Sequence, residues 1–352
     1  MKRVLVAMSG GVDSSVAAFL LKEQGYDCIG VTMKLFDNPD VGIPREHTCC
    51  SLDDVEDARS VARRLGIPHY VFNFSRYFGQ EVMERFAAGY LRGETPNPCI
   101  DCNRYIKFQL LLHRAMKLGC DFIATGHYAR VISSPEGVQL KKGLDETKDQ
   151  SYVLYAMTRE QLARTLFPLG ELRKSQVREI AEREGFVNAR KSDSQDICFV
   201  PDGDYMAFLE RYTQRQFPAG DLLDRDGRVL GQHRGAAAYT IGQRRGLGLA
   251  MGEPYYVCAK DMAKNTVTVG PEQALYTDTV QAGDWNWIAQ PPREPIQVSV
   301  KLRYRQKEQL AELWLEDDVV HMHFSSPQRA VTPGQAAVAY QGDVVLGGGT
   351  IL

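Results

Sequence analysis

The stretch Val4–Lys22, VLVAMSGGVDSSVAAFLLK, constrains the fold of this chain more than any other. Val4–Met8 is a short apolar run typical of a buried strand, and Ser9–Gly11 follows as a tight turn that opens a helix near Asp13. Glycines in such a turn let backbone N–H groups and the positive end of the helix face an anion directly. The hydroxyls and the carboxylate that follow add hydrogen bonds and a ligand for Mg²⁺. The stretch therefore predicts a phosphate-binding turn, and the plainer alternative is a corner whose glycines serve only the backbone.

The hexapeptide SGGVDS lacks the lysine and the spacing of a Walker A loop, and it lacks the third glycine of a dinucleotide fingerprint. It resembles the pyrophosphate-binding loop of the ATP pyrophosphatase (PP-loop) superfamily. The resemblance implies cleavage of ATP between its α and β phosphates and transfer of AMP to an oxygen of the substrate.

The first half of the chain alternates strand-like and helix-like segments, which predicts an α/β fold with a doubly wound parallel sheet. Such sheets bind ligands beyond the carboxyl ends of their strands. Ser9, Met33 and Gly126 follow or end predicted strands, so we expect them to line one crevice. The expected strands are 4–8, 27–36, 69–74 and 121–125, and the expected helices are 51–65 (with Ser51 in a capping box), 80–91, 104–118, 158–165 and 174–184.

The pattern changes after about Arg211, where short apolar runs alternate with turns such as Asp224–Gly227. From Gln297 the alternation is strict, which predicts antiparallel strands with one buried face. In this pattern Val298, Val300, Leu302 and Tyr304 face one way, and Ser299, Lys301, Arg303 and Arg305 face the other. We expect a PP-loop catalytic domain over 1–205, a small central domain over 206–272 and a C-terminal antiparallel β-barrel over 273–352.

Composition excludes several classes of protein. The 352 residues carry a net charge of −2, so any nucleic-acid surface must be local. No apolar run approaches the roughly 20 residues needed to cross a bilayer, and the start has no signal-peptide pattern. We therefore expect a cytoplasmic protein without a membrane partner. We also expect a monomer, an expectation that does not rest on composition.

Eight cysteines in such a protein are thiols, metal ligands or catalytic groups before they are structural disulfides. Cys99 and Cys102 lie in TPNPCIDCN, where Asn103 is expected to cap a helix that begins near Arg104. A thiol at a helix start has a pKa below the usual value of roughly 8.5. The residues around Cys198 do not show whether it meets Cys102. The alternative for Cys102 is a thiol at a helix start that has no role, and the alternative for Cys198 is a buried core thiol. Cys28, Cys120 and Cys258 lie in apolar contexts and are expected in the core.

A longer series of motifs, in order along nearly the whole chain, is similar to the tRNA 2-thiouridylases. The series is SGGVDS, TPNPxxxCN, GHYAR, KDQSY, DSQDICF, RYRQ and VTPGQAAV. The resemblance implies ATP-dependent adenylation of O2 of the wobble uridine, position 34, in tRNAs for Lys, Glu and Gln. Sulfur then arrives as a persulfide passed from a cysteine desulfurase, and 2-thiouridine, AMP and pyrophosphate are the products.

The resemblance also implies roles for single residues, with Cys102 as the nucleophile and Cys198 as the persulfide carrier. ATP, with Mg²⁺, would be held by Ala7, Met8, Ser9, Gly10, Gly11, Val12, Asp13, Ser14, Met33 and Gly126. The tRNA would be contacted by Asn97, Pro98, Cys99, His127, Lys148, Asp149, Gln150, Arg303, Tyr304 and Gln335, with Asn97–Cys99 at the target base. Many members have Asp where this chain has Cys99, and they lack a pair such as Cys49-Cys50.

These extra thiols leave a metal site open as an alternative. Cys49 or Cys50 with Cys99 and Cys102, or Cys99 and Cys102 with Cys198, would supply ligands for an iron–sulfur cluster or zinc. Two further alternatives are another PP-loop enzyme, such as a lysidine synthetase-like tRNA ligase, and a non-enzymatic RNA-binding protein that senses ATP.

Two basic groups predict phosphate contacts, and a solvated strand face is the alternative for both. The first group is Lys301, Arg303, Arg305 and Lys307, and the second is His233, Arg234, Arg244 and Arg245.

Overall fold

The computed structural model describes residues 1–37, 52–134, 137–192, 197–200, 202–249 and 252–352. The chain forms two compact units. The first unit comprises 1–83, 99–203 and 342–346, and the second comprises 84–98, 204–341 and 347–352. The predicted capping residue Ser51 and the pair Cys49-Cys50 lie outside the described residues.

The first unit is built on a parallel sheet of five strands in the order β3-β2-β1-β4-β7. Strands β2 and β4 flank β1, so the strand order reverses at β1, which is where open α/β sheets bind their ligands. The predicted doubly wound sheet is confirmed, and only the two-residue strand β7 was missed. The strands are β1 (Arg3–Ala7), β2 (Asp27–Lys34), β3 (His69–Asn73), β4 (Phe122–Ala124) and β7 (Thr165–Leu166).

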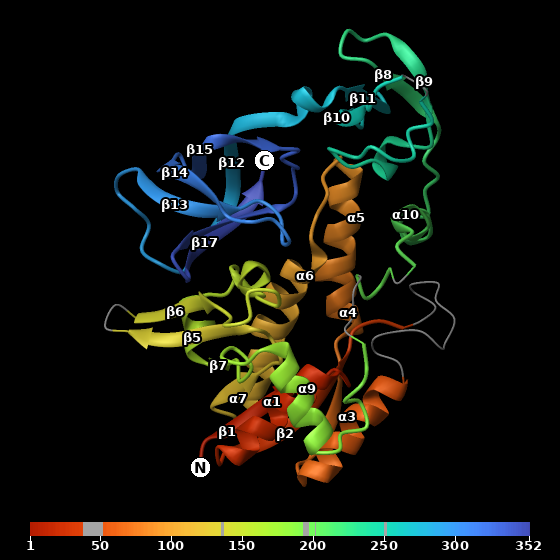
Figure 1. The fold of residues 1–352 in the computed structure, drawn as a ribbon. Helices are drawn as coiled ribbons and strands as arrows, with labels where there is room; N and C mark the ends of the chain where they lie inside the picture. The colour runs from red at the N-terminus through yellow and green to blue at the C-terminus, as the bar shows by residue number, and fades with distance from the viewer. Residues whose placement is uncertain (38–51, 135–136, 193–196, 201, 250–251) are drawn as a thin grey trace. The chain divides into compact units, whose positions relative to one another are not determined.

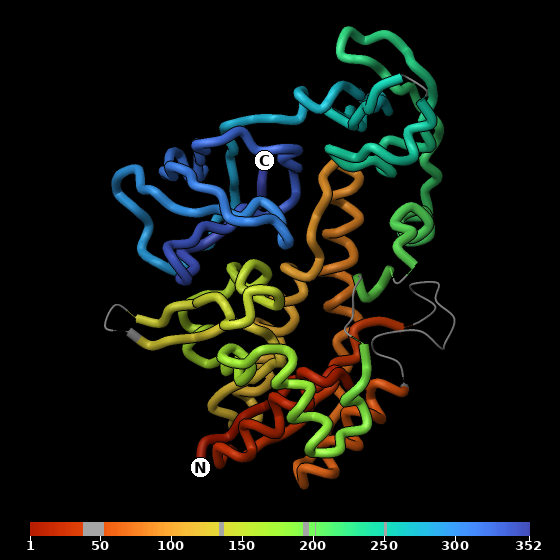
Figure 2. The backbone as a smooth tube through the Cα atoms, in the orientation of Figure 1, coloured from red at the N-terminus to blue at the C-terminus, as the bar shows by residue number. Residues whose placement is uncertain are grey.

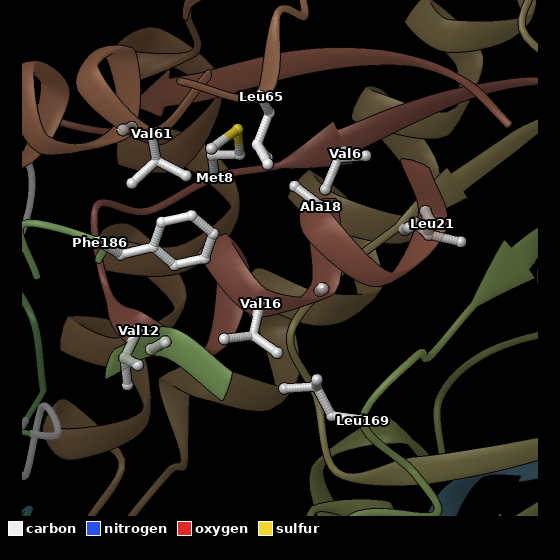
Figure 3. Packing of buried hydrophobic residues seen from close by; sticks show 14 of the residues in the cluster. Val6, Met8, Val12, Val16, Ala18, Leu21, Val61, Leu65, Leu169 and Phe186 are labelled. Atoms are coloured by element: carbon white, nitrogen blue, oxygen red, sulfur yellow. The ribbon is translucent and has the colours of Figure 1, made fainter. Parts of the chain in front are cut away.

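Helix α1 (Val12–Glu23) packs against both α3 (Leu52–Leu65) and α9 (Lys174–Arg183) beside the sheet (Figure 1). Their apolar side chains meet those of β1 in one core, to which Phe186, just after α9, also contributes (Figure 3). This core fixes the two ends of the β1–α1 turn, because β1 and α1 both bury nearly all of their apolar residues. The labelled members of the core are Val6, Met8, Val12, Val16, Ala18, Leu21, Val61, Leu65, Leu169 and Phe186.

Two helices begin earlier than the sequence predicted. The helix expected from Arg104 starts at Pro98 and runs through α6 (Pro98–Asp101), η2 (Cys102–Leu111) and α7 (Leu112–Lys117). Proline suits a first helical turn because its missing N–H would have no partner there. Asn103 is therefore not a cap; it is buried inside the helix and donates from Nδ2 to the carbonyl of Val153 at 2.9 Å.

The helix expected from Gln80 begins at Ser75 and comprises α4 (Ser75–Phe78), η1 (Gly79–Met83) and α5 (Glu84–Leu91). Asn73 accepts hydrogen bonds from both the N–H and the hydroxyl of Ser75, at 3.0 and 2.8 Å, which starts this helix. Segments η1 and η2 both have the wider hydrogen bonding of a π-helix. Such stretches are rare and are frequently found at functional sites.

The first unit also contains a hairpin of β5 (Ala129–Ser134) and β6 (Gly137–Lys142). Segment 342–346 joins it: Val344 pairs with Lys141, and Asp343 forms ion pairs with Arg130 at 2.8 Å and with Lys141 at 3.3 Å. These contacts lower the pKa of the Asp343 carboxyl, against the opposing and largest effect of burial. The remaining elements of this unit are η3 (Ser151–Leu154) and α8 (Arg159–Ala163).

In the second unit a small sheet in the order β10-β11-β8-β9 follows helix α10 (Tyr205–Thr213). The sequence missed α10, whose Tyr205 stacks on Tyr90 of α5 with ring centroids 6.2 Å apart. The turn at Asp224–Gly227 joins β8 to β9 as a hairpin, as predicted. The strands are β8 (Gly220–Leu223), β9 (Val229–His233), β10 (Tyr256–Asp261) and β11 (Thr266–Gly270), and η4 (Ala236–Ala238) packs on them.

The C-terminal strands close into the predicted antiparallel barrel, traced in blue in Figure 2. Closure comes from β12, which pairs with β15 on one side and with β17 on the other. Val298, Val300 and Leu302 are buried as expected, but Tyr304 lies in a turn and is 38% exposed. The elements are η5 (Glu272–Leu275), β12 (Tyr276–Trp287), β13 (Ile296–Lys301), β14 (Gln309–Glu316), β15 (Val319–Arg329), β16 (Ala336–Gln341) and β17 (Val344–Ile351).

Among the residues that the structure describes, none of the helices has the length and apolar character needed to span a bilayer.

Candidate active site

The turn between β1 and α1 is held in one shape by its own side chains. Ser14 donates from its hydroxyl to the carbonyl of Gly11 at 3.0 Å and accepts the N–H of Ser9 at 3.1 Å. Gly10 has φ +77, and a Cβ added to it would lie 2.3 Å from the carbonyl oxygen of Asp54. The first N–H groups of a helix have no partner inside the helix. The turn therefore presents donors and a positive helix end at the carboxyl edge of the sheet.

Gly126 lies against this turn. It follows β4, and a Cβ added to it would come within 2.8 Å of the backbone carbon of Asp13 and the nitrogen of Ser14. Only glycine lets the chain pass so close to the start of α1. Met33 lies at the end of β2, on the other side of β1. Ser9, Met33 and Gly126 thus lie at the carboxyl ends of three adjacent strands, as the sequence predicted.

Asp13 is bound by two residues that the sequence analysis missed. Lys174 Nζ lies 2.7 and 2.8 Å from the two carboxylate oxygens, and the Tyr128 hydroxyl donates to one of them at 2.7 Å. Lys174 is buried, so its charge is matched by Asp13 rather than by water. Tyr128 belongs to the GHYAR motif, which could have indicated it, whereas Lys174 opens an ordinary amphipathic helix.

The segment before Cys198 is tied to the same turn. Asn188 is buried and donates from Nδ2 to the carbonyl of Gly10 and to the hydroxyl of Ser15, both at 2.9 Å. Lys191 forms ion pairs with Asp54 at 2.6 Å and Asp57 at 2.7 Å. Burial lowers the pKa of Lys191, but the two carboxylates outweigh burial and leave the pKa raised. Asn188 and Lys191, which precede Cys198 by ten and seven positions, are therefore anchored on the β1–α1 turn and on helix α3.

Cys102 and Cys198 are both half-buried and both belong to the first unit. Phe199 packs on Phe78 of α4 with ring centroids 5.7 Å apart, and α4 also contacts η2, which Cys102 opens. The structure thus places the two cysteines on elements that pack against the same short helix. Cys102 is the fifth residue of its helix and not the residue before the cap, so the predicted position at the helix start is wrong.

The other described cysteines differ in exposure. Cys99 is exposed, Cys28 and Cys120 are buried as predicted, and Cys258 is only half-buried. Burial raises the pKa of the Cys28 thiol to about 11, which keeps it protonated and unreactive. Within the described ranges, no three His, Cys, Asp or Glu side chains are grouped to hold a metal ion, and Cys49 and Cys50 fall outside those ranges.

Several residues that the resemblance assigned to tRNA are bound within the protein. His127 is 8% exposed, bonds to the hydroxyl of Thr125 at 2.6 Å and packs against Phe108. Asp149 is buried and accepts bonds from Gly143 and Ser151. This burial does not support direct tRNA contacts by either side chain.

Gln150, the next residue, is linked to the β1–α1 turn through Tyr128. It accepts the N–H of Tyr128 on its side chain at 3.0 Å and donates its own N–H to the Tyr128 carbonyl at 2.9 Å. Since Tyr128 bonds to Asp13, Gln150 lies two contacts away from the turn. Lys148, the first residue of the KDQ motif, is half-exposed.

The predicted basic groups are only partly available to RNA. Arg303 donates to the carbonyl of Ala330 at 2.5 Å and to the hydroxyl of Thr332 at 2.8 Å, whereas Arg305 and Lys307 are exposed. In the other group Arg234, Arg244 and Arg245 are exposed.

His233, the fourth member of that second group, is buried. It accepts the N–H of Gly235 at 3.0 Å, and its other ring nitrogen meets the carbonyl of Asn265 at 3.1 Å. The hydrogen bond from Gly235 needs a neutral ring nitrogen, so His233 holds its own loop and is not a phosphate contact.

The buried His127 gives the protein a defined pH dependence. Burial, and secondarily the charge of Lys107, lowers the pKa of His127 well below 6.5, so it is neutral when folded. The unfolded chain binds a proton near pH 6.5 that the folded chain does not, so this contribution to stability is complete above pH 6.5 and is lost as the pH falls. We expect the free energy of unfolding to fall by up to about 1.4 kcal/mol per pH unit below 6.5 from this residue.

Chemical denaturation between pH 7.5 and 5.5 measures that slope. His127→Gln should make it shallower, and His113→Gln, a change at an exposed histidine, should leave it unaltered. An unchanged slope in His127→Gln would show that folding does not change the pKa of this residue.

Three families of domains match successive parts of the chain. Residues 2–202 match the tRNA methyl transferase HUP domain, residues 206–271 the tRNA methyl transferase PRC-barrel domain, and residues 277–351 the aminomethyltransferase beta-barrel domain. A relative from Geotalea uraniireducens, the "tRNA-specific 2-thiouridylase MnmA", is 51% identical over 99% of this chain and 95% of its own. The protein of the same name from Lachnoclostridium phytofermentans is 48% identical over the full length of both chains.

Among solved structures, a 4-thiouridine synthetase in complex with RNA and ATP is 20% identical, with a TM-score of 0.38. It covers 60% of this chain and 50% of its own. At this level of similarity the match carries no argument about function.

Proposed function

Because the chain belongs to the family of tRNA-specific 2-thiouridylases, and is an ATP-binding enzyme that transfers sulfur to a uridine of tRNA, we propose how its residues divide this reaction. The β1–α1 turn binds the phosphates of ATP, and O2 of the wobble uridine attacks the α-phosphorus. The uridine becomes adenylated at O2, and pyrophosphate leaves. The single observation that carries this proposal is the turn itself, with Gly126 packed on it at the switch point of the sheet.

Lys174 and Tyr128 make the turn suitable for a polyphosphate. Asp13 lies in the first turn of α1, where its negative charge would repel the phosphates that the helix end attracts. The ammonium of Lys174 and the hydroxyl of Tyr128 neutralise and hold that carboxylate. Both oxygens of Asp13 are engaged, so this carboxylate does not fit the open Mg²⁺ ligand that the sequence suggested, and no step is assigned to the metal.

The sulfur step uses the two half-buried cysteines. A persulfide donor, charged by a cysteine desulfurase, passes its outer sulfur to Cys198. The Cys102 thiolate attacks the inner sulfur of the Cys198 persulfide, forms a Cys102–Cys198 disulfide and releases hydrosulfide. Hydrosulfide attacks C2 of the adenylated uridine, AMP leaves, and 2-thiouridine remains. An external thiol then supplies the two electrons that reduce the disulfide.

We also propose three functional domains, 1–205, 206–272 and 273–352. The boundaries of the matched families at 2–202, 206–271 and 277–351 support this division. The boundaries of the two compact units differ from these domain boundaries. Helix α5 and the segment that ends at Pro98 belong to the second unit, because they pack with α10 and the barrel.

Reconstitution tests the proposed function. Purified protein is mixed with ATP, unmodified tRNA and a persulfidated donor protein, and position 34 is analysed by mass spectrometry. The proposal predicts 2-thiouridine, with one pyrophosphate and one AMP released for each sulfur transferred. A modified uridine without sulfur would instead favour another PP-loop ligase.

Arg305 offers a clean test of the tRNA surface, because its side chain is exposed and Arg303 is not free to be changed without loosening its loop. We expect Arg305→Glu to weaken tRNA binding about tenfold and to reduce the salt slope of binding by about one. ATP affinity should not change.

Filter binding over a series of salt concentrations measures both quantities. Arg63→Glu, an equal change of charge on the exposed face of α3, serves as the control. Equal effects from the two variants would mean that Arg305 acts only through the net charge.

A further inference from the structure

In the second unit, the barrel loop at residues 330–335 forms hydrogen bonds with Thr95, which lies just before the proposed base contact Asn97. The N–H of Thr95 donates to the carbonyl of Pro333 at 2.8 Å, and Gln335 Nε2 donates to the carbonyl of Thr95 at 2.5 Å. Both main-chain hydrogen-bonding groups of Thr95 are therefore satisfied by residues 333–335. The arrangement resembles one rung of a β-ladder, completed on one side by a side chain.

The approach of these two segments depends on Gly334. Its φ is +87, and a Cβ added to it would lie 2.7 Å from Cβ of Glu94 and 2.9 Å from the nitrogen of Thr95. Any larger residue would push the loop away from Thr95 and would also strain the backbone. The contact is thus built into the loop and is not a chance meeting of flexible side chains.

The loop is itself fixed to the barrel. Gly334 donates its N–H to the carbonyl of Ile351 at 2.9 Å, and Ile351 donates to the carbonyl of Gln335 at 2.8 Å. At the other end, Arg303 bonds to Ala330 and Thr332, which are almost fully buried. Arg303 and the last strand therefore hold both ends of a rigid loop, which in turn holds Thr95.

We propose that Gln335 and Arg303 are positioning residues that act through this loop, here termed the Thr95 clamp (residues 330–335), to fix Thr95–Pro98 in the pose that receives the target uridine. This inference rests on the proposed function, in which Asn97 and its neighbours meet the base. It differs from the direct tRNA contacts that the resemblance implied for Gln335 and Arg303, because the polar groups of both are directed at the protein.

The two roles have different kinetic consequences. A positioning residue leaves tRNA affinity nearly unchanged and lowers the rate at saturating tRNA, because the base is bound but misplaced. A misplacement of about 1 Å can cost up to about 100-fold in rate. A direct contact lowers affinity and leaves the saturated rate unchanged.

Gln335→Met in the full-length protein tests the clamp, because methionine keeps the length of the side chain and removes the N–H donor without a change of charge. Gln290→Met, at an exposed position of the same unit, is the matched control. Hydrogen exchange is followed in peptides that span 94–98, where Pro96 and Pro98 have no N–H, so that Thr95 contributes one of only three amides. Thiolation under single-turnover conditions and tRNA binding are measured in parallel.

We expect Gln335→Met to speed exchange at Thr95 about tenfold, to lower the saturated thiolation rate about tenfold or more, and to change the tRNA Kd less than twofold. Unchanged exchange would overturn the clamp. Faster exchange with a weaker Kd and a normal saturated rate would overturn positioning in favour of direct contact, and faster exchange with no kinetic effect would overturn any role in the reaction. Absence of thiolation in the wild-type protein would refute the proposed function instead, while exchange would still report on the clamp.

Discussion

Replacing Cys198 by serine is expected to abolish formation of 2-thiouridine, by about 10³-fold or more, while tRNA-dependent release of pyrophosphate from ATP continues. A serine hydroxyl cannot carry a persulfide, so no sulfur reaches the adenylated uridine. The ATP-binding turn is held by Ser14, Asn188, Lys174 and Gly126, none of which changes. Because Cys198 is half-buried and serine is of similar size, the fold should survive.

Quantification of both products in one reaction checks this separation of the two steps. Cys258→Ser is the matched control, because Cys258 is also half-buried but lies in β10, where its thiol donates to the carbonyl of Tyr256 at 3.3 Å. It should behave as the wild-type protein. Persistent thiolation in Cys198→Ser would exclude Cys198 as the carrier, and loss of pyrophosphate release would mean that the two steps cannot be separated.

Gly10→Ala is expected to eliminate ATP binding. It should also lower the free energy of unfolding of the first unit by more than the cost of placing an alanine at a positive φ. At φ +77 a Cβ costs roughly 1–2 kcal/mol by itself. The added atom would also lie 2.3 Å from the carbonyl oxygen of Asp54 and must displace either the turn or helix α3. Since Asn188 and Lys191 also bind this region, the displaced turn would lose several contacts at once.

Gly25→Ala separates the two costs. Gly25 has a similar φ, +81, but no atom lies within 4 Å of its added Cβ, so this variant suffers only the backbone strain. Thermal unfolding and nucleotide titration of both variants measure the difference. We expect Gly25→Ala to lose about 1–2 kcal/mol of stability and to bind ATP normally. Equal stability and equal ATP affinity in the two variants would show that the close packing of Gly10 is unimportant.

Much of the first unit could be predicted because its signals are local. The apolar run before Ser9, the glycines that follow it and the alternation of strands and helices all identify the β1–α1 turn and the parallel sheet. Gly126 was placed correctly for the same reason, since it directly follows a recognisable strand. The barrel was recognised from the strict alternation that begins at Gln297.

The partners of the turn could not be predicted, because they come from distant parts of the chain. Lys174 is 161 positions from Asp13, and Asn188 is 178 positions from Gly10. Lys174 opens a helix of ordinary amphipathic pattern, and nothing in its neighbours distinguishes it from an exposed lysine. Only the tertiary structure shows that its charge is buried against a carboxylate.

Other errors came from extending a local pattern too far. Arg303 was assigned to the exposed face of a strand, but that strand ends at Lys301 and the side chain turns back to Ala330. The helix that contains Cys102 was predicted to begin near Arg104 with Asn103 as its cap, whereas it begins at Pro98, which forms part of its first turn. In both cases the kind of element, a strand or a helix, was predicted correctly, but the residue at which it begins or ends was not.

In the proposed sulfur step, Cys198 gives up its sulfur as it forms a disulfide with Cys102. The most direct measurement is peptide mass spectrometry after a single turnover of persulfide-loaded wild-type protein with ATP and tRNA, without reductant, followed by alkylation of free thiols. We expect one Cys102–Cys198 disulfide for each 2-thiouridine formed. Formation of 2-thiouridine with both cysteines still free to be alkylated would contradict it.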